Sequence, residues 1–253
     1  MKKLITFTAS TLILTSLAIN SANADWGSLF DDITKSGKAL LSGDSKTSST
    51  ALDSNTIISG LKEALDVGAR QAIDQVSKPG GYLTNKLIHI AMPPQLQQAS
   101  DLMRKFGLSA QADAFEQSMN HAAEKAAPAA TDILVDAIKN MSIKDANTIL
   151  KGSDDAATQY FKEKTSGKLT ELFRPTINDS LNQVGTTKYY NDLAGQIADV
   201  PFVGEKINVN LPDYVTKEAL NGLYTMIAVE EKKIRENPAA RTTELLKTVF
   251  GSK

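Results

Sequence analysis

The sequence predicts an all-α protein, built as a single multi-helix globular domain of about eight to ten helices, with one small two-stranded β-ribbon as a possible addition. Two observations lead to this prediction. After residue 55, apolar side chains recur every three or four positions in nearly every segment, as they do on the buried face of a helix. The 253 residues are 42% hydrophobic and 23% charged, which is the balance of a globular protein.

The first 24 residues have the pattern of a cleaved Sec signal peptide. Lys2 and Lys3 precede an apolar run, and Ala22-Asn23-Ala24 supplies the small residues that a signal peptidase reads. The apolar run is too short and too rich in hydroxyl groups for a bilayer span of about 20 residues. We therefore expect cleavage after Ala24 and an exported chain, which would be periplasmic in a Gram-negative cell and secreted otherwise.

Residues 25–55 are predicted to form an N-terminal amphipathic arm and a linker. The arm begins at Trp26, and residues 42–55 are rich in Ser, Thr and Asp, as linkers are. Docking on the body of the protein or disorder is favoured over binding to a membrane surface. Residues 56–253 form the predicted helical domain, and no segment of the mature chain is apolar for long enough to span a membrane.

The first helix of the domain is predicted to start near Thr56, a suitable N-cap. The sequence Lys78-Pro79-Gly80-Gly81 ends it, because proline cannot continue a helix and glycine permits a left-handed turn. Residues 84–92 alternate apolar and polar side chains, which predicts an extended segment. Further helices are expected after Pro93-Pro94 and after Ser109.

Pro128 is expected to restart the chain as another helix. Ser142-Ile143-Lys144-Asp145 then has the form of a capping box, and Lys151-Gly152 ends the short helix that it opens. A longer helix is predicted to begin at Ser153-Asp154-Asp155, with a kink or a restart at Pro175.

The last third of the domain is also predicted to be helical. One helix is expected around Tyr189. Residues 207–211 alternate in character and are the second candidate for the β-ribbon, paired with residues 87–92. Thr216 is predicted to cap the longest helix, Asn237-Pro238 to end it, and a final helix to follow.

Composition and missing motifs exclude several classes of function. The chain has no cysteine, so it has no disulfide, thiolate nucleophile or cysteine-ligated metal. Its 28 Lys and Arg against 29 Asp and Glu leave no basic excess for binding nucleic acid. The H-E-x-x-H, G-x-S-x-G, P-loop and dinucleotide-binding motifs are absent, and Ser59-x-x-Lys62 matches a serine-lysine hydrolase motif without its companion motifs. His89 and His121 are expected at the surface. We therefore expect no catalytic residue, metal or cofactor.

Two clusters of polar residues are candidates for a functional role. Asp155, Gln159 and Tyr160 follow a helix start, where an acid stabilises free N–H groups, or alternatively they border a ligand-binding cleft. Glu230 and Glu231 flank an apolar stripe. We interpret these two acids as a structural polar clamp with Arg241, the nearest base after the helix break; a solvated pair and a ligand site are the alternatives.

A third cluster consists of Glu116, Asn120 and Glu124, which recur at every fourth residue of one predicted helix. This spacing places them on one side of the helix, next to an apolar stripe. We expect a solvated face or hydrogen bonds to a neighbouring helix.

With these segments laid out, the chain from about Thr56 to Gly251 resembles the bacterial family of exported proteins known as domain of unknown function 4197. The resemblance implies a mostly helical exported protein and carries no established activity or catalytic residue. The passages that carry it are Gly60-Leu61-Lys62-Glu63-Ala64-Leu65, Met92-Pro93-Pro94, Met119-Asn120, Ala122-Ala123-Glu124, Asp154-Asp155-Ala156-Ala157-Thr158-Gln159-Tyr160-Phe161, Tyr214-Val215-Thr216, Asn237-Pro238-Ala239-Ala240-Arg241-Thr242-Thr243 and Leu245-Leu246.

The leading functional hypothesis is a non-enzymatic protein of the cell envelope that binds a partner protein or a small apolar or amphipathic ligand between helices. Asp155, Gln159, Tyr160 and Arg241 are the residues expected to border such a site. One alternative is a hydrolase or lyase that uses paired carboxylates, either Asp154 with Asp155 or Glu230 with Glu231. Another is an envelope scaffold or chaperone that acts through the N-terminal arm.

Overall fold

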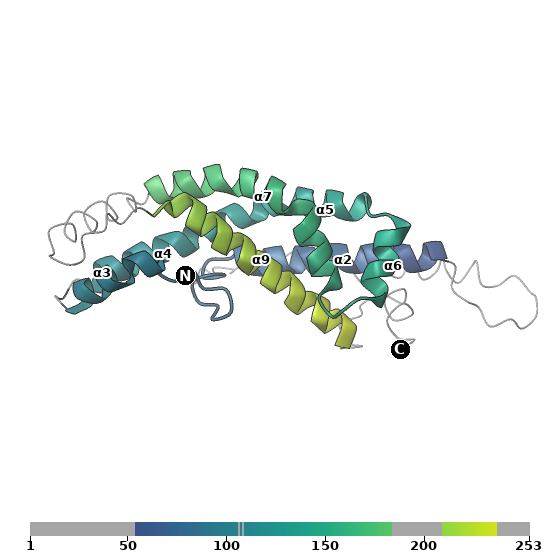
Figure 1. Ribbon diagram of the computed structural model, residues 1–253, viewed down its shortest axis with the longest axis horizontal. Helices are drawn as coiled ribbons and strands as arrows, with labels where there is room; N and C mark the ends of the chain where they lie inside the picture. The colour runs from purple at the N-terminus through teal and green to yellow at the C-terminus, as the bar shows by residue number, and fades with distance from the viewer. Residues whose placement is uncertain (1–53, 106, 108, 184–208, 237–253) are drawn as a thin grey trace, which may run out of the picture. The chain divides into compact units, whose positions relative to one another are not determined.

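The regular structure of the protein is helical, as the sequence predicts (Figure 1). The computed structural model describes residues 54–105, 107, 109–183 and 209–236, which all belong to one unit spanning residues 51–253. These residues contain seven α-helices, one 3₁₀ turn and no strand. The elements are α2 (Ser54–Ser77), α3 (Pro94–Lys105), α4 (Ser109–Ala126), η1 (Ala127–Ala129), α5 (Ala130–Lys139), α6 (Ile143–Lys151), α7 (Ala156–Gln183) and α9 (Leu211–Glu236). The arm and the helices predicted around Tyr189 and beyond Pro238 lie outside the described residues.

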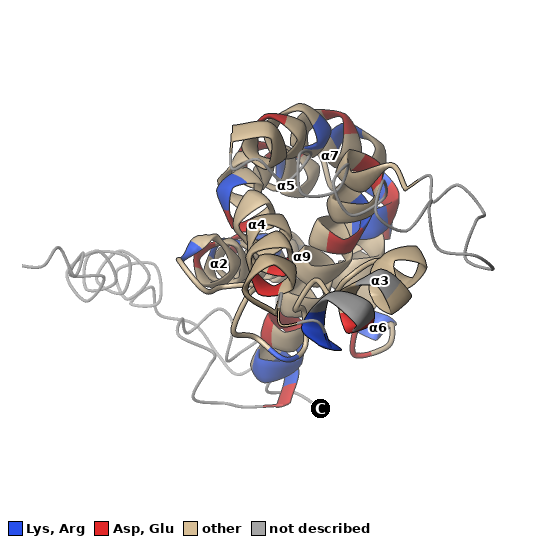
Figure 2. Ribbon diagram, turned by 90° about the vertical axis from the view of Figure 1, so that its left-hand side faces the viewer, with Lys and Arg blue, Asp and Glu red and all other residues tan. Residues whose placement is uncertain are grey.

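Helix α9 packs against α2, α4 and α7 (Figure 1). One continuous core of apolar side chains joins these helices. Its fully buried members include Phe161 and Phe173 on α7 and Leu223 on α9. Basic and acidic positions are interspersed along the outer parts of the described helices (Figure 2). None of the described helices is long and apolar enough to cross a membrane.

Most of the predicted helix boundaries are confirmed by local contacts. The Ser142 hydroxyl accepts from the Asp145 backbone N–H at 3.1 Å, and the Asp145 side chain accepts from the Ser142 N–H, so α6 does begin with a capping box. Gly80 follows α2 with a φ of 83°, in the left-handed region that favours glycine. At Pro175 no restart occurs, and α7 is one continuous helix. Pro175 is exposed, so solvent can satisfy the carbonyl group that its missing N–H leaves free.

The prediction that Thr216 caps α9 is wrong. The helix begins earlier, at Leu211, and the Asn210 side chain accepts a hydrogen bond from the Asp213 N–H at 3.2 Å. Asparagine is among the best N-cap residues, and Pro212 suits a first helical turn. Thr216 therefore lies inside the helix, where it is 2% exposed.

The extended segment predicted at residues 84–92 does not form a strand, because residues 86–88 are a turn and residues 89–92 have irregular backbone. The alternating apolar side chains are buried, as in a strand, but a side chain from α4 takes the place of a partner strand. The Asn120 amide donates to the Ile90 carbonyl and accepts from the Ile90 N–H, both at 2.9 Å. On the other side of the predicted ribbon, Leu211 is the first residue of α9.

The ridge of α4 formed by Glu116, Asn120 and Glu124 therefore holds residues 78–93 through hydrogen bonds. The buried Glu124 accepts from the backbone N–H groups of Tyr82 and Leu83, at 3.1 and 3.2 Å. These side chains satisfy backbone groups that no helix or strand satisfies, which is what buried backbone requires. The predicted hydrogen bonds to a neighbouring helix are therefore corrected, because Asn120 and Glu124 are buried and bind the non-helical backbone of Tyr82, Leu83 and Ile90 instead.

The two histidines reinforce the same ridge. His89 is half-buried, not at the surface as expected, with its Nδ1 at 2.9 Å from the Leu83 carbonyl and its Nε2 at 2.5 Å from Glu116. Because a carbonyl oxygen only accepts, the Nδ1 atom carries a proton. His121 is exposed as predicted, and its Nδ1 lies 2.9 Å from Glu124.

Tyr82 links this irregular segment to α9. Its ring is fully buried, and its hydroxyl donates to the Ala219 carbonyl at 2.6 Å. Burial raises the pKa of this hydroxyl, which keeps the tyrosine neutral. Gly222, one turn further along α9, leaves the space for the ring, because a Cβ atom there would lie 2.5 Å from Tyr82 Cε1.

We predict that Gly222→Ala destabilises the protein although alanine is the better helix former. The clash with Tyr82 and Ile88 should lower the free energy of unfolding by about 1–3 kcal/mol, as overpacking does. Gly167→Ala on α7 is the matched control, because it has open space, and should raise the same free energy by about 0.5–1 kcal/mol. Urea unfolding of both variants measures the difference. Equal stabilisation by both substitutions would contradict the packing described here.

Candidate functional site

The adjacent acids Glu230 and Glu231 of α9 are both buried, and they bind different neighbours. Successive residues of a helix point about 100° apart, so the two side chains face different helices. Glu230 accepts a hydrogen bond from Gln75 of α2 and another from Lys233, both at 2.7 Å. Its contacts thus connect α9 to α2.

Glu231 caps the start of α7. One carboxylate oxygen accepts from the Ala157 N–H at 2.9 Å; the other accepts from the Thr158 N–H at 2.9 Å and from the Thr158 hydroxyl at 2.8 Å. The first N–H groups of a helix have no partner within the helix, and a negative charge there also interacts favourably with the helix dipole. A side chain from α9 therefore performs the capping that the residues before Ala156 were predicted to perform.

Arg235 neutralises the charge of Glu231. Its side chain is 8% exposed, and its Nε and Nη2 atoms lie 3.1 and 2.8 Å from Glu231 Oε1. Nη2 also donates to the Ile149 carbonyl of α6 at 3.0 Å. A buried ion pair is tolerated when its other hydrogen-bonding groups are satisfied as well, and this pair joins α6, α7 and α9.

The sequence-based interpretation named Arg241 as the base of this clamp. Arg241 lies outside the described residues, so its pairing with Glu230 or Glu231 stays a prediction. The sequence-based prediction misses Arg235, although this residue follows Glu231 by four residues on one helix. That spacing brings an acid and a base together on a helix surface, and it was the available signal.

The structure brings Asp155 and Gln159 together and directs Tyr160 elsewhere. Asp155 accepts from the Ser153 hydroxyl at 2.6 Å and from the Gln159 amide at 3.0 Å, and these hydrogen bonds lower the pKa of the carboxyl group. The Tyr160 hydroxyl donates to the Ala137 carbonyl of α5 at 2.8 Å, and partial burial raises its pKa. A ligand-binding role for Asp155, Gln159 and Tyr160 stays a prediction, as does that of Arg241.

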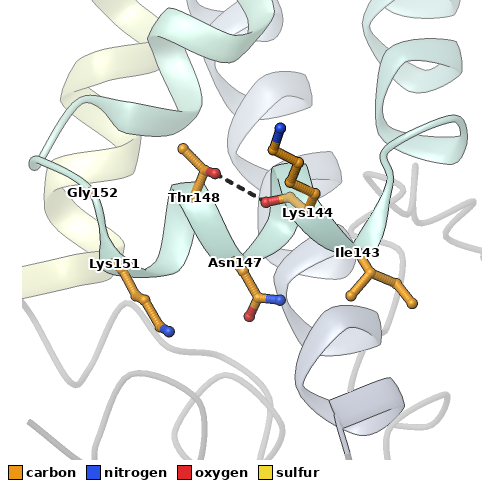
Figure 3. A pocket seen from close by; sticks show the side chains of 6 residues that line it. All are labelled: Ile143, Lys144, Asn147, Thr148, Lys151 and Gly152. Carbon is orange, nitrogen blue, oxygen red and sulfur yellow. Dashed lines mark hydrogen bonds between the residues drawn. The ribbon is translucent and has the colours of Figure 1, made fainter.

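Helix α6 borders a wide, open hollow (Figure 3). Ile143, Asn147 and Lys151 point to one side of the helix, and Lys144 and Thr148 to the other. Ile143 is 61% exposed, and the Thr148 hydroxyl is already hydrogen-bonded to the Lys144 carbonyl. This hollow has described lining residues from one helix only, and none of its side chains is buried, so it offers little to hold a ligand in place.

A second hollow lies between two helices, α7 and α9, and forms a groove. It is lined by Lys162, Ser166 and Thr170 of α7 and by Asp213, Thr216, Lys217, Leu220, Asn221 and Tyr224 of α9. The α7 residues are four apart, and those of α9 follow a spacing of three or four. Each helix therefore presents one face to the groove. We refer to these nine residues as the α7–α9 groove.

The register of the two helices positions the groove. They run antiparallel: Glu231 contacts Thr158, and seven residues further along α7 Thr165 meets Tyr224, seven residues back along α9, with 2.9 Å between the hydroxyl oxygens. Further along, Arg174 and Asp213 form an ion pair at 2.8 Å. The groove lies along this stretch, away from the Glu231 end of the pair of helices.

Thr216 is the unusual residue of the groove. Its hydroxyl oxygen is buried and makes no hydrogen bond with the described part of the protein. Threonine inside a helix commonly donates to the carbonyl four residues before it, as Thr165 does to Phe161 at 2.6 Å. Leaving a buried hydroxyl without a partner costs about 1–3 kcal/mol. Thr216 is one of the residues that line the groove, and the described part of the protein uses neither the donor nor the acceptor of its hydroxyl.

The groove also carries unpaired positive charge. Lys162 of α7 and Lys217 of α9 have no hydrogen bond or ion pair with any residue that the structure describes. The only acid of the groove lining, Asp213, is paired with Arg174. In the described ranges, no three His, Asp or Glu side chains converge to hold a metal ion. The chemistry that the groove offers is therefore binding through cations, hydroxyls and apolar surface.

Fold and site together define an all-α protein with a partly polar interhelical groove. The model of the family described as Protein of unknown function (DUF4197) matches residues 51–251, and the chain belongs to this family. The match confirms the resemblance found in the sequence. No curated protein and no solved structure matches the chain.

Glu231→Gln should destabilise the protein strongly. The substitution leaves Arg235 without its carboxylate and points an amide N–H₂ at N–H or hydroxyl groups of α7, so we expect a loss of about 3 kcal/mol in the free energy of unfolding. Glu236→Gln, which breaks the exposed pair with Lys232, should change it by no more than about 0.5 kcal/mol. Guanidinium unfolding compares the two. A Glu231→Gln variant as stable as the control would refute the capping role.

Proposed function

We propose that this protein is an exported, non-enzymatic component of the cell envelope that binds a small amphipathic ligand in the α7–α9 groove. The observation that carries the proposal is Thr216, whose buried hydroxyl lacks a partner in the described part of the protein and which lines the groove. Such a group costs stability unless something outside the described residues satisfies it. The apolar surface of Leu220 and Tyr224 supports an amphipathic ligand, since a purely polar one would leave that surface unused.

The export part of the proposal rests on the sequence of the first 24 residues. We expect the protein in its native cell to begin at Asp25 and to fractionate with the periplasm or the medium. Mass spectrometry of the intact protein checks the cleavage, and fractionation checks the location. A cytoplasmic protein that retains residues 1–24 would refute export and leave the groove unaffected.

Ligand binding is tested by native mass spectrometry of the full mature chain, purified from its own cells without detergent. We expect a retained small molecule in the wild type. Asn221→Trp should abolish retention, because Asn221 is exposed and lines the α7–α9 groove, where an indole ring would fill the space.

Asn147→Trp is the matched control, since Asn147 is equally exposed and lines the hollow beside α6. It should retain the molecule as the wild type does. Loss of the molecule from Asn147→Trp alone would move the site to α6. A molecule retained equally by all three proteins, or by none of them, would count against the groove as a ligand site.

A further inference from the structure

The charges and donors of the α7–α9 groove specify the chemical class of its ligand; this inference rests on the function proposed above. Lys162 and Lys217 come from opposite helices and line the same hollow. With Asp213 neutralised by Arg174, the remaining charge of the groove lining is positive. Two ammonium groups without a carboxylate partner among the described residues favour a ligand with a negative group that both can reach.

The neutral polar groups of the groove also favour an anion. Ser166 is half-buried, and its hydroxyl has no partner among the described residues, which is also true of Thr216. Thr170 differs, because its hydroxyl donates to the Ser166 carbonyl at 2.8 Å. The two unused hydroxyls can donate to an oxyanion, and hydrogen bonds to a charged acceptor are about twice as strong as those between neutral groups.

Tyr224 contributes apolar surface and no proton. Thr165 uses its hydroxyl hydrogen to donate to the Phe161 carbonyl at 2.6 Å, so at 2.9 Å it accepts from the Tyr224 hydroxyl. The Tyr224 proton is therefore committed to the interior, and burial raises its pKa and keeps the ring neutral. Leu220 and Tyr224 are each 6% exposed and belong to the core, and the small part of their apolar surface that faces the groove is what a hydrocarbon chain can pack against.

We infer that the α7–α9 groove binds a single-chain amphipathic oxyanion, with a carboxylate or phosphate head between Lys162 and Lys217 that accepts from the Ser166 and Thr216 hydroxyls, and with an apolar chain on Leu220 and Tyr224. Carboxylate and phosphate heads share this chemistry. Octanoate and octyl phosphate, used as probes, distinguish a carboxylate head from a phosphate head.

Isothermal titration of the mature full chain with four probes of one chain length tests the inference. Octanoate and octyl phosphate should bind, 1-octanol should bind at least about tenfold more weakly, and octylammonium should not bind. A tenfold change corresponds to about 1.4 kcal/mol, which is the lower range for a hydrogen bond to a charged group. The tighter of the two anions identifies the head group.

Variants locate the anion. Lys162→Met and Lys217→Met should each weaken octanoate by about tenfold and leave 1-octanol within about twofold, because only the charge is lost. Thr216→Val should weaken octanoate by about fivefold. Lys168→Met, an exposed lysine on α7 outside the groove, is the control and should have no effect.

The outcomes separate the two proposals. Equal binding of octanoate and 1-octanol, both blocked by Asn221→Trp, would overturn the anionic head and leave the proposed function standing. Equal effects of Lys162→Met and Lys168→Met would also overturn it. Retention of a natural molecule without binding of any octyl probe would overturn this head-and-chain assignment alone. No binding of any probe together with no retained molecule would overturn both proposals.

Discussion

The carboxylate of Glu231, buried where α6, α7 and α9 meet, is the interaction on which the described fold depends most. It satisfies three donors at the start of α7, and Arg235 balances its charge and reaches α6. In a poorly solvated environment each of these contacts is strong, and each unsatisfied member would be costly. A shift of α9 by one residue would turn Glu231 away from α7. The contact therefore sets the register between the two longest described helices.

That register determines what the same two helices do further along. Two turns away the pair brings Thr165 and Tyr224 together, and beyond them Arg174 meets Asp213. The α7–α9 groove lies along this second stretch. At the Glu231 end no described buried side-chain polar atom lacks a partner, whereas in the groove one buried hydroxyl and two exposed lysines have no described partner. Near Glu231 the two helices are therefore joined by satisfied hydrogen bonds, whereas along the groove they carry polar groups that are available to a ligand.

The sequence predicted those features that depend on neighbouring residues. The helical class, the capping box at Ser142 and the end of α2 before Gly80 follow from local spacing and turn chemistry. The alternation of residues 84–92 correctly marked buried side chains, but the same pattern arises when the Asn120 side chain replaces a partner strand. Such a substitution depends on the tertiary position of α4, which periodicity does not encode.

Contacts between helices could not be predicted from the sequence for the same reason. The sequence singles out Glu230 and Glu231 and predicts Arg241 as their basic partner. It does not show that the start of α7 lies beside Glu231. Threonine is a common N-cap, so the sequence predicts a cap at Thr216; the helix starts five residues earlier because Asn210 accepts from the Asp213 N–H. The groove is lined by residues about 50 positions apart in the sequence, so no local sequence pattern predicts it.

The free-energy costs of leaving Lys162, Lys217 and Thr216 unpaired differ, and this difference bears on the function of the groove. Lys162 and Lys217 are exposed, so leaving them unpaired costs little, because water solvates their charges. Thr216 is different, since valine would have nearly the same shape without a buried hydroxyl that lacks a partner. A protein selected for stability alone gains nothing from threonine there. Threonine is favoured over valine if a ligand brings a hydrogen-bond acceptor to this hydroxyl. Lys162 and Lys217, one on each helix, indicate that this acceptor carries negative charge. Bound between α7 and α9, such an anion would add a further contact between the two helices beside those of Thr165 with Tyr224 and of Arg174 with Asp213. Occupancy would then raise the free energy of unfolding by RT ln(1 + L/Kd), where L is the concentration of free ligand.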